Sequence, residues 1–185
     1  MRLTQQAHEA VKKFLKPGDF AIDATAGNGH DTLFLAQQVG EEGRVAAFDI
    51  QLEALEASAR LLASHALQGR VGLFHASHDE LASHLPQAWK NRVRVVMMNL
   101  GYLPGGDHTK VTTTRTTMSF LGEIHAWLAA RSLISILAYR GHEGGKEEHA
   151  SVLAWAEQSP FKLQRQVGPH PESPELFLLS RTGGI

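Results

Sequence analysis

An apolar run near the middle of the chain ends in a polar residue, and a glycine-rich loop follows it, in the stretch VVMMNLGYLPGGDHTK (95–110). Asn99 ends the run, and Leu100, Gly101 and Tyr102 follow. Asn99 offers an amide oxygen, Leu100 offers a backbone carbonyl, and Tyr102 offers a ring that can flank a base. Gly101 leaves room for a ligand beside the backbone. Because Asn, Gly and Pro also form turns, an ordinary turn is the alternative interpretation.

A second candidate site is the stretch AIDATAGNGHDT (21–32), which follows a short apolar run and opens an expected helix. Gly27 and Gly29 permit close backbone approach and unusual dihedral angles. Asp49 ends the next apolar run, 20 residues beyond Gly29, where a carboxylate can accept both hydroxyls of a ribose. This context favours a nucleoside cofactor over the alternative, a tight strand-to-helix turn without a ligand.

The glycine turn departs from the dinucleotide pattern G-x-G-x-x-G in a way that indicates the type of cofactor. Thr32 stands where the third glycine is expected, and Asp23 precedes the turn. A carboxylate there would repel a pyrophosphate but would attract a ligand with a positively charged amino-acid group. The turn therefore favours S-adenosylmethionine over NAD.

Strands that alternate with helices must position these residues. The expected strands are 20–23, 44–50, 71–76, 92–100, 132–139, 161–167 and 175–181, and the expected helices are 4–15, 31–39, 52–67, about 115–130 and 146–158. Alternation of this kind predicts βαβ units and a parallel sheet with helices on both faces. The last two strands have no helix between them, so we expect an antiparallel pair at one edge. Ligands of such a sheet bind at the carboxyl ends of its strands, where Asn99 would lie.

Composition narrows the class of protein. The 185 residues suit a single domain spanning 1–185, with the helix 4–15, capped by Thr4, packed on it. A formal net charge of −1 excludes a strongly basic coat for nonspecific nucleic-acid binding. The absence of cysteine excludes disulfides, thiolate metal sites and cysteine nucleophiles. The scattered histidines show no zinc spacing, so we expect no metal. No signal peptide or membrane-spanning run is evident, so a cytoplasmic protein is expected.

Three motifs together carry a family resemblance. DATAGNGHD (23–31) resembles motif I of the class I methyltransferases, and with NLGYLPGGD (99–107) and YRGHEGG (139–145) the chain resembles the bacterial YtqB-like/MnmM family over nearly its whole length. The resemblance implies a Rossmann-like class I methyltransferase fold: a seven-stranded, mostly parallel sheet with an antiparallel last strand. It also implies N-methylation of the 5-aminomethyl group of (2-thio)uridine at wobble position 34 of tRNA.

The resemblance also implies a cofactor site. Its residues would be Asp23, Thr25, Gly27, Asn28, Gly29, Asp31, Thr32, Asp49, Gln51, Ser77 and His78. Asp31 and Thr32 reach the cofactor carboxylate or cap the helix, and Ser77 contacts adenine or caps a helix. Thr25 replaces the first glycine of the common motif, and its hydroxyl could restore a lost backbone contact.

For catalysis, the resemblance assigns Asn99, Leu100 and Tyr102. The amide oxygen of Asn99 and the carbonyl of Leu100 would accept hydrogen bonds from the target nitrogen and aim its lone pair at the methyl group. A carbon acceptor would normally need a cysteine, which the chain lacks. A primary amine, with a solution pKa of about 10, must be deprotonated first. Three residues are candidates for that base: His78, Asp107 and His142.

Two polar segments are candidates for binding the anticodon loop. The loop 105–117 carries Lys110 and Arg115, which could bind phosphates, although a solvated loop is an equal alternative. At the end of the fifth expected strand, Tyr139 could stack on a base and Arg140 could contact phosphate. The substrate-binding set is therefore Asp107, Lys110, Arg115, Tyr139, Arg140 and His142.

The expected partner is tRNA, with a homodimer left open. Two rival functions are a methyltransferase acting on rRNA or on a small-molecule amine, and a regulatory protein that binds S-adenosylmethionine without turnover.

Overall fold

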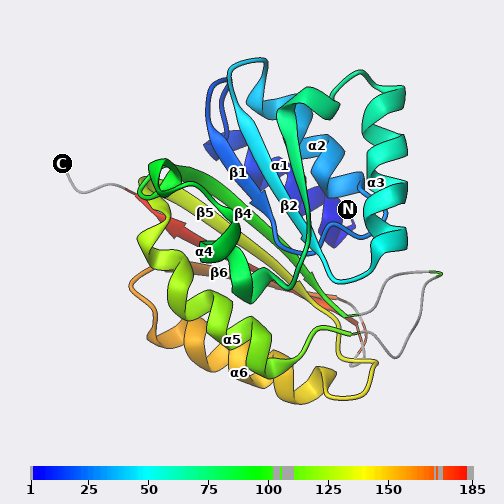
Figure 1. The fold of residues 1–185 in the computed structure, drawn as a ribbon. Coiled ribbons are helices and arrows are strands. Elements are labelled where there is room, and N and C mark those ends of the chain that lie inside the picture. The colour runs from blue at the N-terminus through cyan, green and yellow to red at the C-terminus, as the bar shows by residue number, and fades with distance from the viewer. Residues whose placement is uncertain (1, 102–104, 106–110, 169, 171–172, 183–185) are drawn as a thin grey trace.

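The computed structural model describes residues 2–101, 105, 111–168, 170 and 173–182. Within them, seven strands form one sheet in the order β3-β2-β1-β4-β5-β7-β6 (Figure 1). The strands are β1 (Phe20–Asp23), β2 (Arg44–Asp49), β3 (Val71–His75), β4 (Val93–Leu100), β5 (Leu128–Ala138), β6 (Lys162–Val167) and β7 (Glu175–Arg181). Strands β1 to β5 are parallel, and β7 runs antiparallel to both β5 and β6. The predicted fold is confirmed.

Helices cover both faces of the sheet (Figure 1). They are α1 (Leu3–Phe14), α2 (His30–Val39), α3 (Leu52–Ser64), α4 (Leu81–His84), α5 (Thr114–Glu123) and α6 (Gly145–Gln158). Apolar side chains of α1, α2 and α3 pack on one face, and those of α4, α5 and α6 pack on the other. Within the described part of the chain, no helix is long and apolar enough to span a membrane.

Strand β4 shows how the apolar run positions its polar tip. Val95 and Met97 belong to the core under α1 and α2, whereas Val96 and Met98 belong to the core under α5 and α6. Successive side chains of a strand point to opposite faces. Asn99 therefore lies on the face of the sheet that α1 and α2 cover.

Several predicted boundaries differ from those in the structure. The first helix begins at Leu3, after Arg2, because the side chain of Gln5 accepts a hydrogen bond from the backbone N–H of Arg2 at 3.0 Å. Thr4 therefore lies inside the helix and is not its cap. The helix expected over 115–130 ends at Glu123, and a short 3₁₀ turn over Ile124–Ala126 follows.

Strand β5 begins at Leu128, four residues before the expected start at Ser132. Leu128 pairs with Val93, and the register then shifts before Val95 pairs with Leu133. The segment therefore joins the sheet across an irregularity, and pairing overrides the helix-forming residues that it contains.

Candidate functional site

Three polar side chains lie at the carboxyl ends of adjacent strands. Asp23 ends β1, Asp49 ends β2 and Asn99 is the penultimate residue of β4. Because β1 lies between β2 and β4, these residues lie side by side where the carboxyl ends of the three strands meet. This is the edge at which open α/β sheets bind ligands.

The glycine loop after β1 is held by β2 and α3. Asp49 accepts hydrogen bonds from the backbone N–H of Gly27 at 2.8 Å and from that of Gln51 at 2.9 Å. Burial raises the pKa of Asp49, and these hydrogen bonds oppose that increase. The hydroxyl of Ser58 donates to the carbonyl of Gly27 at 3.0 Å. The Asp49 carboxylate therefore lies beside the backbone of the glycine loop and has lone pairs that the hydrogen bonds from Gly27 and Gln51 do not use.

Gly29 can be no other residue without a change in the loop. Its φ is +84°, and a Cβ atom there would lie 2.7 Å from the Ser58 hydroxyl and 2.8 Å from the Ser58 Cα. The second contact is with backbone, so a side-chain rotation cannot relieve it. Ser58 was not predicted from the sequence, because it lies inside a helix and is brought to the loop by packing. Asn28 lies between the two glycines of this loop.

Asp23 is fully buried and connects the strand to α2. Its carboxylate accepts from the hydroxyl of Thr32 at 2.6 Å and from the backbone N–H of Thr25 at 3.2 Å. Burial, followed by the charge of Asp31, raises the pKa of Asp23 to about 7. The N-cap of α2 is Gly29, without a side-chain cap hydrogen bond, so Thr32 and Asp31 do not cap the helix.

Asn99 is fixed through both of its nitrogen atoms. Its backbone N–H donates to the hydroxyl of Thr25 at 2.7 Å, and its amide nitrogen donates to Asp31 Oδ2 at 2.7 Å. The hydroxyl of Thr25 therefore contacts the backbone of β4, and its replacement of the motif's lost backbone contact stays a prediction. Because an ionised carboxylate only accepts hydrogen bonds, Asp31 must face the NH₂ group of Asn99, which directs the amide oxygen away from it.

The backbone carbonyl groups after Asn99 are already hydrogen-bonded. The carbonyl of Leu100 accepts from the N–H of Tyr139 at 3.1 Å, and that of Gly101 accepts from the N–H of Thr112 at 3.0 Å. A second hydrogen bond at Leu100 would have to use its remaining lone pair. The Asn99 amide oxygen is therefore the stronger candidate acceptor for a ligand.

Asp31 has a second partner that the sequence did not indicate. His8 of α1 lies 2.6 Å from Asp31 Oδ1 through its Nε2 atom, and the His8 ring stacks on Phe34. Burial alone would raise the pKa of Asp31, but the hydrogen bonds from His8 and Asn99 hold it below its ordinary value. Asp31, which was predicted to bind the cofactor, is thus hydrogen-bonded both to the candidate catalytic residue Asn99 and to His8 of α1.

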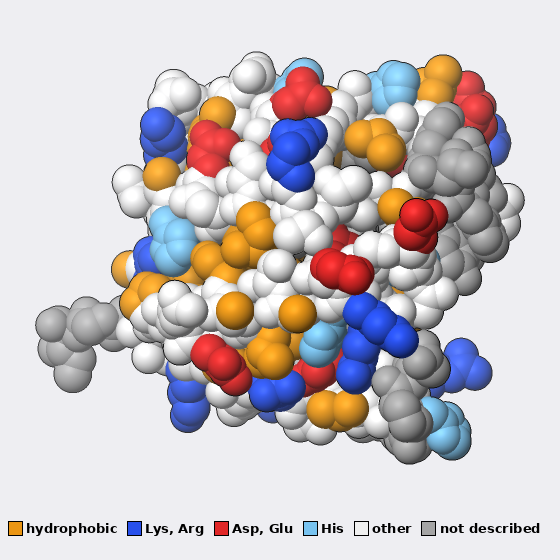
Figure 2. All heavy atoms as spheres, turned by 90° about the horizontal axis from the view of Figure 1, so that it is seen from below, with side chains coloured by type: hydrophobic (Ala, Val, Ile, Leu, Met, Phe, Trp, Pro, Cys, Tyr) orange, Lys and Arg blue, Asp and Glu red, His pale blue; other side chains and the backbone are white. Residues whose placement is uncertain are grey.

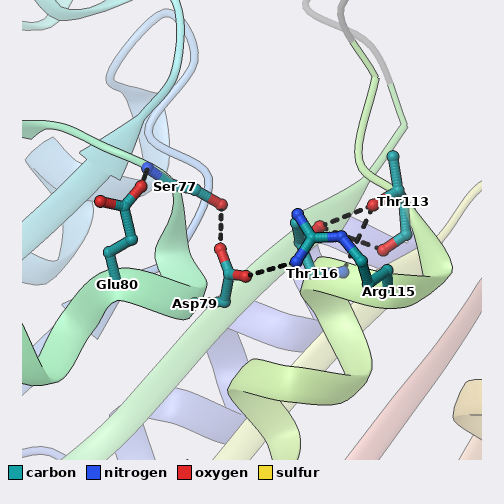
Figure 3. Close-up of polar contacts among 6 residues, drawn as sticks. All are labelled: Ser77, Asp79, Glu80, Thr113, Arg115 and Thr116. Carbon is teal, nitrogen blue, oxygen red and sulfur yellow. Dashed lines mark hydrogen bonds and ion pairs between the residues drawn. The ribbon is translucent and has the colours of Figure 1, made fainter.

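The segment after β3 contacts the start of α5 (Figure 3). Ser77 is the N-cap of the short turn over His78–Glu80, and its backbone N–H donates to the side chain of Glu80 at 3.3 Å. Its hydroxyl also donates to Asp79. Arg115 forms an ion pair with Asp79 at 3.4 Å, although its side chain is 80% exposed. The Asp79 side chain is only 12% exposed, and it also accepts from Ser77, so the phosphate contact predicted for Arg115 would compete with this ion pair.

His78 is buried rather than exposed in a cleft. Its ring packs edge-on against Phe120, with the centroids 5.5 Å apart. Burial lowers its pKa to about 4, against the opposing charge of Asp79, so the imidazole is neutral near pH 7. Its Nε2 atom has no hydrogen-bond partner among the described residues. Because the His78 ring is neutral and buried, it is better suited to contact a ligand than to exchange protons with solvent.

The end of β5 places an aromatic ring beside the β4 loop. Tyr139 is 41% exposed, and a Cβ atom added to Gly101 would lie 3.6 Å from the Cβ of Tyr139 and 3.8 Å from the His142 ring. Arg140 instead faces inward, 3.8 Å from the buried carboxylate of Glu175. Glu175 also binds His149 and Arg165, so the phosphate contact predicted for Arg140 competes with a buried acid.

Tyr102, Asp107 and Lys110, which the sequence assigned to catalysis and substrate binding, lie outside the described residues. Their predicted roles stay predictions. Of the described candidates, one group lies around the glycine loop with Asp49, and a second lies at the ends of β4 and β5 with Asn99 and Tyr139. Ser77, His78 and Arg115 lie apart from these groups near the start of α5, and Arg140 faces Glu175.

Comparison with known proteins places this geometry in context. A protein-family model described as "Putative rRNA methylase" matches residues 45–167. The Arabidopsis thaliana protein named "tRNA (mnm(5)s(2)U34)-methyltransferase, chloroplastic" is 38% identical over 168 residues, which cover 86% of this chain. The chain spans 60% of the length of that relative.

Two solved structures are similar over almost the entire chain. The crystal structure of a "putative rRNA-methylase" from Clostridium thermocellum superposes with a TM-score of 0.91 at 35% identity, covering 98% of both chains. A Streptococcus mutans structure described as a "putative methyltransferase" in complex with SAH has a TM-score of 0.86 at 26% identity, covering 98% of this chain and 99% of its own.

Proposed function

Because the chain belongs to the rRNA methylase family, we propose that it is an S-adenosylmethionine-dependent methyltransferase acting on tRNA. The target is the aminomethyl nitrogen of a wobble uridine at position 34, and the product is 5-methylaminomethyl-(2-thio)uridine. The name of the Arabidopsis thaliana relative supports the substrate, and the complex of the Streptococcus mutans relative with SAH supports the cofactor. The proposal takes the anticodon loop as the contacted part of the tRNA and the cytoplasm as the compartment.

The observation that carries the proposal is the orientation of the Asn99 amide. Its NH₂ group is bound to Asp31 at 2.7 Å, so its oxygen is the atom available to a ligand at the carboxyl edge. An oxygen acceptor suits an amine, whose N–H groups donate to it while the lone pair points elsewhere. A preorganised acceptor of this kind aligns the nucleophile before reaction.

The residues around the glycine loop fit the proposed cofactor. Asp49 retains acceptor lone pairs for ribose hydroxyls, and the closeness of Gly29 to Ser58 leaves no room for a side chain at position 29. Asp23, Asp31 and Asp49 surround the loop with acidic groups, which suits a ligand that carries a sulfonium and an ammonium group. The bound cofactor would supply an electrophilic methyl group.

The chemical step requires a neutral amine. The target nitrogen releases a proton, its lone pair forms a bond to the methyl carbon, and the carbon–sulfur bond breaks with its electrons remaining on sulfur. The protein contributes alignment, which can be worth roughly 7–11 kcal/mol, and a site that disfavours the ammonium form. Among the described candidates, His142 lies beside Gly101, whereas His78 is buried.

The surface charge is compatible with a modest electrostatic contribution to RNA binding. On the face seen in Figure 2, basic and acidic side chains are interspersed. With a net charge of −1, binding would rest on a few phosphate contacts, Arg115 among them. The affinity for tRNA should therefore fall with added salt, with a slope that reports only a few neutralised phosphates.

The experiment that tests the function is methylation of defined RNAs with mass spectrometry of the nucleosides. The substrates are tRNA carrying 5-aminomethyl-uridine, with and without the 2-thio group, together with rRNA and the free nucleoside. A mass gain of one methyl group on the wobble uridine of tRNA is expected. Equal activity on the free nucleoside or on rRNA would favour the first rival function, and cofactor binding without turnover on any substrate would favour a regulatory protein.

A further inference from the structure

Three polar side chains from different elements form one hydrogen-bonded line that ends at the proposed acceptor. His8 Nε2 lies 2.6 Å from Asp31 Oδ1, and Asp31 Oδ2 accepts from the Asn99 amide nitrogen at 2.7 Å. The first residue belongs to α1, the second to α2 and the third to β4. Asp31 thus uses one oxygen for each neighbour.

The middle of this line is well shielded from solvent. The Asp31 side chain is 14% exposed, and that of His8 is 28% exposed. A carboxylate so buried is stable only if both of its oxygens are hydrogen-bonded, since an unpaired buried charge is costly. Removal of the His8 hydrogen bond would leave Asn99 as the single side-chain donor to that carboxylate among the described residues.

The position of His8 is set by packing rather than by chance. Its ring is stacked on Phe34 of α2, with the centroids 3.8 Å apart and the planes 4° from parallel. The adjacent Ala7 and the following Val11 are buried in the core under α1. Packing of α1 therefore holds the His8 ring next to Asp31, near the carboxyl ends of the strands.

We propose that His8 is a positioning residue for methyl transfer: it holds Asp31 so that the Asn99 amide oxygen faces the target amine. This inference rests on the proposed function, since the amine is the target assumed there. With His8 in place, Asp31 remains an acceptor for the NH₂ group, and the alternative orientation of the amide, with oxygen against carboxylate, is repulsive. Without His8, Asp31 can rotate or take up a proton, and the amide loses its single orientation.

Two substitutions separate hydrogen bonding from packing. His8→Phe keeps a ring against Phe34 but has no donor for Asp31, whereas His8→Gln loses the ring but keeps an amide N–H at about the place of Nε2. Glu9→Ala is the matched control, because Glu9 is the next residue of the same helix and contacts Lys12 at the surface, at 2.8 Å. A merely structural histidine would be replaced better by Phe than by Gln.

The first measurement is the single-turnover rate of methylation at saturating cofactor and aminomethyl-uridine tRNA. His8→Phe should lower the rate by roughly 10- to 100-fold, the scale of a misaligned reacting group. The tRNA dissociation constant should stay within about twofold, as for Glu9→Ala, and the saturating cofactor keeps any effect of Asp31 on cofactor affinity out of the rate. His8→Gln should recover most of the rate. A full rate for His8→Phe, or a Gln variant as slow as the Phe variant, would overturn the inference.

The second measurement does not depend on the substrate. The side-chain amide signals of Asn99, assigned in a ¹H–¹⁵N spectrum by their loss in Asn99→Ala, should move in His8→Phe and remain in place in Glu9→Ala. Unchanged Asn99 signals in His8→Phe would overturn the inference even if the enzyme methylates tRNA. If the wild type methylates no RNA, the proposed function fails, and the Asn99 signals still decide whether His8 holds the amide.

Discussion

The hydroxyl of Thr25 accepts a hydrogen bond from the backbone N–H of Asn99 at 2.7 Å, across 74 positions of sequence. This contact joins the glycine loop, where the cofactor is proposed to bind, to the tip of β4, where the amine is proposed to bind. Thr25, the residue that departs from the common superfamily motif, is therefore the residue that connects the proposed cofactor site with the proposed amine site.

Substitution of Thr25 tests this connection. Thr25→Val keeps the shape but leaves the partly buried N–H of Asn99 without its acceptor, which should cost about 1–3 kcal/mol of unfolding free energy. Thr25→Ser keeps the hydroxyl and should retain most of the stability and activity. Urea denaturation, with methylation assays alongside, measures both effects. Equal behaviour of the Val and Ser variants would show that the hydroxyl is dispensable.

Asp49→Asn should weaken cofactor binding. The substitution removes the charge that faces the proposed ribose and places an NH₂ group against the backbone N–H of either Gly27 or Gln51. Loss of a hydrogen bond to a charged group is worth about 1.5–3 kcal/mol, so the dissociation constant should rise at least about tenfold. Isothermal titration calorimetry with S-adenosylhomocysteine measures it, with the exposed acid variant Glu53→Gln as control. An unchanged affinity in Asp49→Asn would remove Asp49 from the cofactor site.

Gly29→Ala and Gly18→Ala form a matched pair, because both glycines have a positive φ, +84° and +89°. A Cβ at Gly18 meets nothing within 4 Å, so the cost should be the strain of a left-handed residue, about 1–2 kcal/mol. A Cβ at Gly29 also collides with Ser58, which should add about 1–3 kcal/mol. Only the Gly29 variant should lose cofactor affinity. Melting temperatures and calorimetry test the pair, and equal affinity in both variants would contradict the proposed loop.

Asp23 should make the cofactor-free protein less stable as the pH rises from about 4 through about 7. Its pKa is raised, first by burial and then by Asp31, to about 7 in the folded state. Over that range the folded state binds more protons than the unfolded state, so the unfolding free energy falls with pH. Denaturation of wild type and Asp23→Asn at several pH values isolates this contribution. A wild-type advantage that grows as the pH rises would contradict the sign.

The succession of strands and helices along the chain and the location of the site follow from local signals in the sequence. Strands buried on both faces read as apolar runs, and β1, β2 and β4 each carry a polar residue at or next to the carboxyl end, so Asp23, Asp49 and Asn99 could be placed together. The segment 128–131 could not be predicted as part of a strand, because its Leu, Ala and Arg residues favour a helix. Pairing of Leu128 with Val93 in the sheet makes it the start of β5.

The rest of the site depends on contacts that local patterns do not encode. Ser58 and His8 lie on helix faces, where period and composition assign them no special role, and tertiary packing brings them to Gly27 and Asp31. Arg115 and Arg140 read as phosphate ligands because their acidic partners, Asp79 and Glu175, are 36 and 35 positions away. Sequence reasoning identified the charged residues and could not identify their partners.

The central claim is that the Asn99 amide oxygen orients the amine for methyl transfer. The most direct measurement is the single-turnover rate of methylation of aminomethyl-uridine tRNA by wild type and Asn99→Ala, at saturating cofactor. The account predicts a decrease of about 10²-fold or more, the scale of losing one preorganised polar contact in a dry site, with cofactor affinity and melting temperature nearly unchanged. Methylation by Asn99→Ala at the wild-type rate would contradict it, and Asn99 would then be a turn residue at the end of β4.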